Sequence, residues 1–192
     1  MLSKYHIIEI LKDTFKSLGT NINGYRDKPI QVFVMFIILP ILLSVLMIYF
    51  GIFVNKDLTS LLVSGLSIFC GLFFSLIIVV VDKVNKRKEQ LSSQEDEEVR
   101  NYIFRYVLFS KSLIAQISFA IIICIVIILF ILVLSVDFHF ITNVLIKKYG
   151  KLFCHFIVFV LSIQFLLILY LIVSSMYSMF LEDIDLKFKK NN

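Results

Sequence analysis

The sequence predicts an all-α integral membrane protein, a bundle of four transmembrane helices with an N-terminal amphipathic helix and a long third helix that extends into the cytoplasm. The chain of 192 residues is 59% apolar and only 17% charged, whereas soluble domains are about 45–50% apolar and about 25% charged. The apolar residues gather in four blocks, each long enough for the roughly 20 helical residues that cross a hydrocarbon core. This composition excludes a soluble enzyme, a nucleic-acid-binding domain and a disulfide-stapled secreted module.

The N-terminal part, residues 1–28, is expected to form a short amphipathic helix over 1–18 followed by a connector. Apolar residues repeat there at spacings of three and four, at Ile8, Leu11, Phe15 and Leu18. Gly19 follows the last of them, at the position of a C-cap glycine. The segment is too short and too charged to span, so it fits the membrane interface or the cytoplasmic end of the bundle.

The transmembrane domain is expected over residues 29–181, with spans at about 30–54, 58–81, 113–136 and 152–181. Pro29 stands at the start of the first span, where its missing N–H costs nothing. Pro40 lies inside that span and predicts a kink, because its ring clashes with the preceding helical turn. A connector of residues 55–57 is so short that it forces the first two spans into an antiparallel hairpin.

The cytoplasmic loop 82–112 is expected to contain a polar turn and then the start of the third helix. Ser92 with Glu95 fits a capping box. Neither Pro nor Gly occurs between Glu95 and Val136, so one continuous helix is expected from this loop through the third span. Residues 137–151 read as a short amphipathic segment that ends at Gly150. The charged tail 182–192 is expected to be frayed and cytoplasmic.

The distribution of Lys and Arg predicts the orientation. Fifteen of the 19 lie in the N-terminal segment, the middle loop and the tail, and four lie in the two other connectors. The positive-inside rule therefore places both termini and the loop 82–112 in the cytoplasm of a multi-pass membrane protein. The net charge of +5 follows from this topology, and direct binding to nucleic acid is not expected because no dense basic face with interleaved aromatics occurs.

The residue types in the spans argue against catalysis and coupled transport. The predicted spans contain no Asp, Glu, Lys or Arg, which an intramembrane enzyme or a proton-coupled carrier requires. The notable polar residues there are Gln116, Gln164 and His155. Hydrogen bonding within the bundle is the expected role of all three, with pore lining as the alternative for the two amides. The cysteines lack metal-ligand spacing and are expected to be packing residues: Cys70, Cys124 and Cys154. No enzymatic activity, cofactor or metal is expected.

A stripe of small residues runs along the second span. Its members recur at spacings of three and four, at Ser60, Ser64, Ser67, Gly71 and Ser75, with Gly65 and Cys70 beside them. Small residues at this spacing let another helix backbone approach closely. Packing inside the same bundle, a subunit interface and a serine-lined ion path in an oligomer are all compatible with the pattern. Phe73 projects from another side of the helix, so replacing it is expected to matter less for assembly.

The charge changes sign along the middle loop. A basic cluster comes first, at Lys83, Lys86, Arg87 and Lys88, and is expected to contact anionic lipid headgroups. An acidic run follows, at Glu95, Asp96, Glu97 and Glu98. These carboxylates either form a solvated helix start or offer a docking surface to a basic cytoplasmic partner.

The stretch from Leu66 to Ile77, followed by Asp82 and Lys83, together with the four-span layout, resembles the small four-transmembrane proteins of prokaryotic antiviral defence systems. These include effectors associated with nucleotide second-messenger signalling and membrane accessories of RNA-targeting CRISPR systems. The resemblance covers the layout of the whole chain and assigns no residue a role. It implies disturbance of membrane integrity, or pore formation, on a trigger.

Two functional hypotheses follow. The first is an oligomeric membrane effector that alters permeability when a cytoplasmic partner or ligand triggers it, with membrane lipids and further copies of the chain as partners. The alternative is a non-conducting membrane anchor or accessory subunit that recruits or regulates a cytoplasmic protein. The largest cytoplasmic piece is a short loop, so the trigger is expected to be a separate chain or a small surface.

Overall fold

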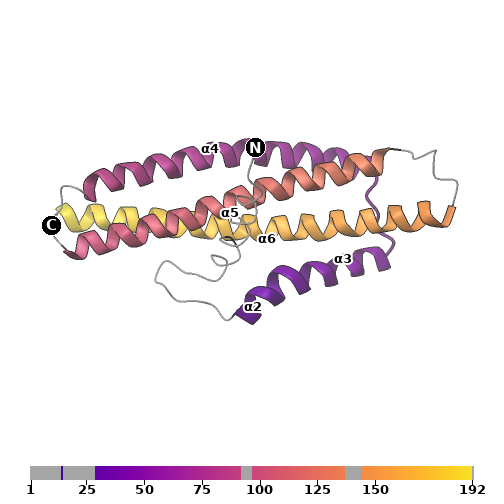
Figure 1. Ribbon diagram of the computed structural model, residues 1–192, viewed down its shortest axis with the longest axis horizontal. Helices are drawn as coiled ribbons and strands as arrows, with labels where there is room; N and C mark the ends of the chain where they lie inside the picture. The colour runs from indigo at the N-terminus through magenta and orange to yellow at the C-terminus, as the bar shows by residue number, and fades with distance from the viewer. Residues whose placement is uncertain (1–13, 15–28, 92–96, 137–143, 192) are drawn as a thin grey trace, which may run out of the picture. The chain divides into compact units, whose positions relative to one another are not determined.

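The computed structural model describes Thr14 and residues 29–91, 97–136 and 144–191, and nearly all of these are helical. The elements in chain order are α2 (Pro29–Phe33), the π-helical turn η1 (Val34–Ile38), α3 (Leu39–Tyr49), α4 (Lys56–Leu91), α5 (Glu97–Ser135) and α6 (Val144–Asn191) (Figure 1). The helix formed by α2, η1 and α3 counts as one span, and with α4, α5 and α6 it makes four helices long and apolar enough to cross a membrane. The predicted all-α class is confirmed for the described residues, with four span-length helices among them.

The first of these helices is distorted just before Pro40, where the sequence predicts a kink. The distortion takes the form of the π-helical turn η1, in which the Leu39 N–H donates to the Val34 carbonyl one residue farther back than in an α-helix. A widened turn is one of the ways in which a helix accommodates a proline ring. The buried residues of this helix follow each other at four-residue spacing, at Phe36, Pro40 and Ser44. The Ser44 hydroxyl donates to the Pro40 carbonyl at 2.7 Å.

The first helix ends at Tyr49 rather than near residue 54, because the chain turns at Gly51. This glycine has a φ of 71°, a left-handed conformation that only glycine adopts without cost. Asn55 then caps α4: its side-chain Oδ1 accepts the Leu58 N–H at 2.8 Å and its carbonyl accepts the Thr59 N–H at 2.9 Å.

Three further helix boundaries differ from the sequence prediction. α4 continues through the basic cluster to Leu91, where a polar turn was expected, because the Lys, Arg, Glu and Gln residues of that stretch favour helix. α6 begins at Val144 and passes through Gly150, where an end was expected, and it continues to Asn191. One glycine costs a helix only about 1 kcal/mol, which the flanking turns of a long helix outweigh. The expected N-terminal helix over 1–18, apart from Thr14, and residues 92–96 with the expected capping box lie outside the described residues.

The chain divides into two compact units, and α4, α5 and α6 each contribute to both. The first unit contains Thr14, residues 73–119 and residues 168–191. Large apolar side chains fill its interior: Phe73, Val80, Val84, Ile103, Tyr106, Leu113, Ile117, Ile168, Ile172 and Met179. Thr14, fully buried, attaches the N-terminal part of the chain to this unit by donating from its hydroxyl to the Ala115 carbonyl at 3.2 Å.

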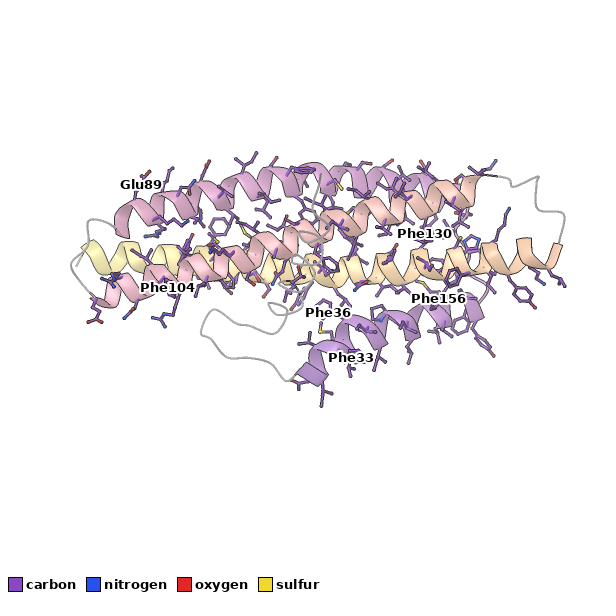
Figure 2. All side chains as sticks on the ribbon, in the orientation of Figure 1. Phe33, Phe36, Glu89, Phe104, Phe130 and Phe156 are labelled. Atoms are coloured by element: carbon purple, nitrogen blue, oxygen red, sulfur yellow. The ribbon has the colours of Figure 1, made fainter. Side chains whose placement is uncertain are left out.

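The second unit contains residues 29–72 and 120–167. α5 supplies most of its core, which comprises Phe36, Leu66, Ala120, Ile121, Ile123, Cys124, Ile127, Ile131, Val158, Phe159 and Phe165. The rings of Phe69 and Phe165 meet edge to face with centroids 5.6 Å apart and join α4 to α6. The side chains of the described residues are drawn in Figure 2, where Phe36 and Phe130 are labelled.

Candidate functional site

The part of the chain that is described contains no cluster of side chains suited to bind a metal ion. No three His, Cys, Asp or Glu side chains among the described residues come together as metal ligands would. Cys124 is buried, Cys70 and Cys154 are half-buried, and all three are free thiols. The expectation that the chain is not an enzyme stays a prediction, which these observations do not test.

The three polar residues predicted inside the spans have different surroundings. Gln116 belongs to the first unit and is buried, with 4% of its surface exposed. Gln164 belongs to the second unit and is half-buried. His155, also half-buried, packs its ring edge to face on Phe53 with centroids 5.5 Å apart, and its buried Nδ1 atom has no hydrogen-bond partner. The expected hydrogen bond is therefore absent at that nitrogen, and the imidazole ring packs against an aromatic ring.

The stripe of small residues faces away from the core of the protein. All five members lie on the exposed side of α4: Ser60, Ser64, Ser67, Gly71 and Ser75. The opposite side of α4 carries the buried residues at spacings of seven, seven and four, at Leu66, Phe73, Val80 and Val84. Packing inside the same bundle, one of the three interpretations of the stripe, does not account for this orientation.

The local geometry of the stripe leaves room for a second backbone. A Cβ atom added at Gly71 would have no neighbour within 4 Å, and the same holds at Gly65 beside the stripe. The Ser67 hydroxyl donates to the Val63 carbonyl of its own helix at 2.7 Å, which satisfies it without water. Ser67 is therefore suited to an apolar environment even though it lies on the surface of the chain.

The basic cluster of α4 is divided between two environments in the first unit. Lys83 and Arg87 are half-buried over aromatic rings, with the Lys83 Nζ 4.1 Å from the centroid of Phe180 and the Arg87 guanidinium carbon 5.6 Å from that of Tyr106. These two cations connect α4 to α6 and to α5 by cation–π contacts. The other two members, Lys86 and Lys88, are exposed and remain candidates for contact with lipid headgroups.

The acidic run is described only in part. Glu97 and Glu98 belong to the first turn of α5, and the Glu97 side chain is exposed. The other two members, Glu95 and Asp96, lie outside the described residues. An exposed carboxylate at a helix N-terminus interacts favourably with the helix dipole, and it is also open to a partner.

The structure brings forward a surface that sequence reasoning missed. On α5, Phe104 is 62% exposed and Leu108 is 50% exposed, and three exposed cations accompany them at Arg100, Arg105 and Lys111. The helical spacing contains a signal for this surface, because Ile103 and Tyr106 are buried on one face of the helix and these residues occupy the other face. Comparison of the chain with protein-family models, with curated proteins and with solved structures gave no significant match.

Proposed function

We propose that the chain is a self-associating protein of a bacterial inner membrane that alters bilayer permeability when a cytoplasmic partner or ligand engages it, in the manner of antiviral defence effectors. The observation that carries this proposal is the outward orientation of the small-residue stripe on α4. An exposed row of Ser and Gly in a span-length helix is the arrangement with which membrane helices of separate chains approach each other.

The orientation of the spans is part of the proposal. The excess of Lys and Arg in the N-terminal segment, the middle loop and the tail supports a topology with both termini and the loop 82–112 in the cytoplasm. Four span-length helices bring the chain back to the side on which it began, in agreement with that count.

The closed interior of each unit supports a path for ions between copies of the chain rather than through a single copy. Fully buried positions are occupied by branched aliphatic residues, including Ile117 and Ile168 in the first unit and Ile127 and Val158 in the second. Side chains packed at the density of protein interiors leave no room for a hydrated ion. A path through the bilayer would therefore form between copies, where the serines of α4 supply hydroxyl groups.

The start of α5 is the proposed trigger. Glu97 is exposed there, and the same helix continues without a break to Ser135, so a force on its cytoplasmic end is transmitted along a rigid element. A partner shifts the equilibrium between two states only by the difference in its affinity for them. The acidic run offers that difference if its carboxylates are accessible in one state and covered in the other.

Leakage of a trapped dye from reconstituted vesicles tests the proposal. The protein is titrated into lipid with and without the soluble fraction of its host. We expect leakage that rises steeply with the protein-to-lipid ratio, that is lost in Gly71→Leu and that is retained in Gly65→Leu. Replacing Glu95, Asp96, Glu97 and Glu98 by their amides removes the response to the soluble fraction but leaves expression and assembly intact.

The alternative, a non-conducting anchor, is favoured by the same closed interior and exposed acidic start. It makes the opposite prediction in this assay. A wild-type protein that never releases dye at any ratio or with any fraction, yet binds a soluble protein through Glu95–Glu98, is an anchor and not a pore.

A further inference from the structure

The cytoplasmic end of α5 has an exposed face with an apolar centre and basic flanks. At 3.6 residues per turn, Phe104 and Leu108 lie in line along the helix, with Arg100 and Lys111 on one flank and Arg105 on the other. Phe104 is 62% exposed and Leu108 50%, and the three cations are exposed as well. Phe104 is labelled in Figure 2. We refer to Phe104, Arg105, Leu108 and Lys111 as the α5 basic face.

The core of the first unit fixes the direction of this face. The opposite side of the same turns carries Ile103, Tyr106 and Leu113, each no more than 3% exposed. Ser110 on that side is also buried, and its hydroxyl donates to the Tyr106 carbonyl at 2.9 Å. Rotation of α5 to hide Phe104 and Leu108 would expose these buried residues, so the α5 basic face is a permanent surface of the folded chain.

The charge on this face distinguishes it from the corresponding part of α4. The exposed charges at this end of α4 balance each other, with Asp82 and Glu89 against Lys86 and Lys88, and α4 therefore presents little net charge outward. The α5 basic face contains no carboxylate among its members, and the exposed Glu97 on the same helix is seven residues from Phe104. Anions are therefore attracted more strongly to the α5 basic face than to the exposed side of α4.

The contacts inside the first unit give the level of this face along the helices. Arg87 on α4 lies over Tyr106 on α5, and Lys83 lies over Phe180. Asp82 on α4 and Lys111 on α5 are the charged residues that border the apolar runs of these two helices. Because Asp82 is five residues from Arg87 and Lys111 is five residues from Tyr106, the two lie at a similar level. Phe104 is seven residues from Lys111, about 10 Å along the axis at 1.5 Å per residue. The headgroup layer of a bilayer is about 5–8 Å deep on each side, so Lys111 and Leu108 lie within this layer, and Arg105 and Phe104 lie at its water-facing edge.

We propose that the α5 basic face binds the anionic headgroups of phospholipids at the cytoplasmic surface of the membrane. Arg105 and Lys111 contact phosphate oxygens from the two flanks, the Leu108 side chain reaches toward the boundary between headgroups and acyl chains, and the Phe104 ring packs among the outer headgroups. A guanidinium group is suited to phosphate because its N–H donors form two parallel hydrogen bonds. The inference rests on the proposed function in one respect, since it requires that the helices cross a bilayer.

The sequence contains no tryptophan, so a single introduced indole reports on one position of the intact chain. Phe104→Trp places it on the α5 basic face, and Leu129→Trp places it on α5 within the apolar run, where Leu129 is 55% exposed. Each variant is reconstituted into phosphatidylcholine vesicles with a minor fraction of phosphatidylglycerol. The quencher is phosphatidylcholine or phosphatidylglycerol that carries bromine close to its headgroup. The two brominated lipids are compared at equal mole fraction.

We expect the fluorescence of the Phe104→Trp variant to be quenched by brominated phosphatidylglycerol with an apparent affinity at least about fivefold higher than by brominated phosphatidylcholine, since each cation near a membrane surface enriches an anionic lipid about fivefold. The preference disappears when Arg105→Gln and Lys111→Gln are added. It persists in the matched control, Lys86→Gln with Lys88→Gln, which removes two exposed cations from α4. The indole of Leu129→Trp is expected to be quenched by both lipids alike.

Two results would overturn the inference while leaving the proposed function intact, provided that the indole at position 129 is quenched. The first is equal quenching of the indole at position 104 by the two lipids, or loss of the preference in the α4 control. The second is no quenching at position 104 by either lipid, the outcome for a face that is hydrated or covered by an acidic protein segment. Absence of quenching at position 129 would instead refute the membrane crossing itself, and with it both proposals.

Discussion

Helices α4 and α5 are both long and apolar enough to span a membrane, yet they are used differently. In the most apolar part of α5, 44% of the residues are buried inside the protein, against 17% in α4. α5 carries its isoleucines around much of its circumference and is the main source of core residues in the second unit. α4 buries one row of bulky residues and turns its serines and glycine outward.

The difference teaches that α4 is asymmetric in side-chain size rather than in polarity. Both of its faces are compatible with lipid, so polarity does not decide which one turns inward. Bulky residues such as Leu66 and Phe73 gain dispersion contacts when they are packed, whereas Ser and Gly have few atoms to contribute. Large residues therefore fill the buried row of α4, although others such as Leu61 and Ile68 are exposed, and the small residues are left for a partner whose backbone can come close.

The largest effect is expected from truncation in the core of α5. Ile127 is fully buried, and Ile127→Ala is expected to lower the free energy of unfolding by about 2 kcal/mol or more, because the cavity removes packing contacts. Ile125 on the same helix is 50% exposed, so Ile125→Ala is expected to change stability by about 0.5 kcal/mol or less. The measurement is loss of helical circular dichroism during titration with sodium dodecyl sulfate in mixed micelles. Equal losses of stability in the two variants would mean that α5 has no buried side that differs from its exposed side.

A smaller effect, on association alone, is expected from bulk added to the α4 stripe. Gly71→Leu should weaken self-association on the order of tenfold to a hundredfold, since overpacking costs about 1–3 kcal/mol, and it should leave the fold of one chain intact because the added Cβ meets nothing within 4 Å. Energy transfer between labelled chains in vesicles measures the association. Gly65→Leu is the matched control, the same change on the same helix at another open position beside the stripe.

The outcome at Phe73 sharpens the same test. This side chain projects away from the stripe, as expected, but it is only 3% exposed, so replacing it with Ala is expected to lower the stability of the fold rather than to weaken association alone. Association that survives Gly71→Leu unchanged, or falls equally in Gly65→Leu, would show that the stripe is not the contact between copies.

The smallest effect is expected at the contact between the two helices. Arg87→Gln removes the cation over the Tyr106 ring and is expected to cost about 1 kcal/mol of stability. Lys88→Gln, at the exposed neighbouring position, is expected to cost nothing measurable. The same detergent titration compares them, with Arg87→Lys as the variant that keeps the charge. Indistinguishable midpoints for the Gln variants at 87 and 88 would mean that the cation–π contact does not stabilise the pairing of α4 with α5.

Much of the fold can be read from the sequence because apolar length and helix-breaking residues act locally. The four spans follow from hydropathy alone, and the distortion in the first helix follows from Pro40. The continuity of α5 follows from the absence of Pro and Gly between Glu95 and Val136. The misjudged boundaries, at Leu91 and at Val144, lie where charged or glycine-containing segments extend a helix beyond its apolar run, since length stabilises a helix once it has formed.

The sequence by itself determined that the chain is helical, that it has four span-length segments and that its small residues share one side of α4, because these properties depend on composition and on the 3.6-residue period. The tertiary structure was needed to show that this side faces outward, that α5 supplies most of the core of the second unit, and that Phe104 and Leu108 are exposed between cations while Tyr106 is buried under Arg87. In an apolar chain, hydrophobicity no longer separates inside from outside. The choice of buried face then depends on how side-chain volumes on different helices fit together, which no single segment of sequence contains.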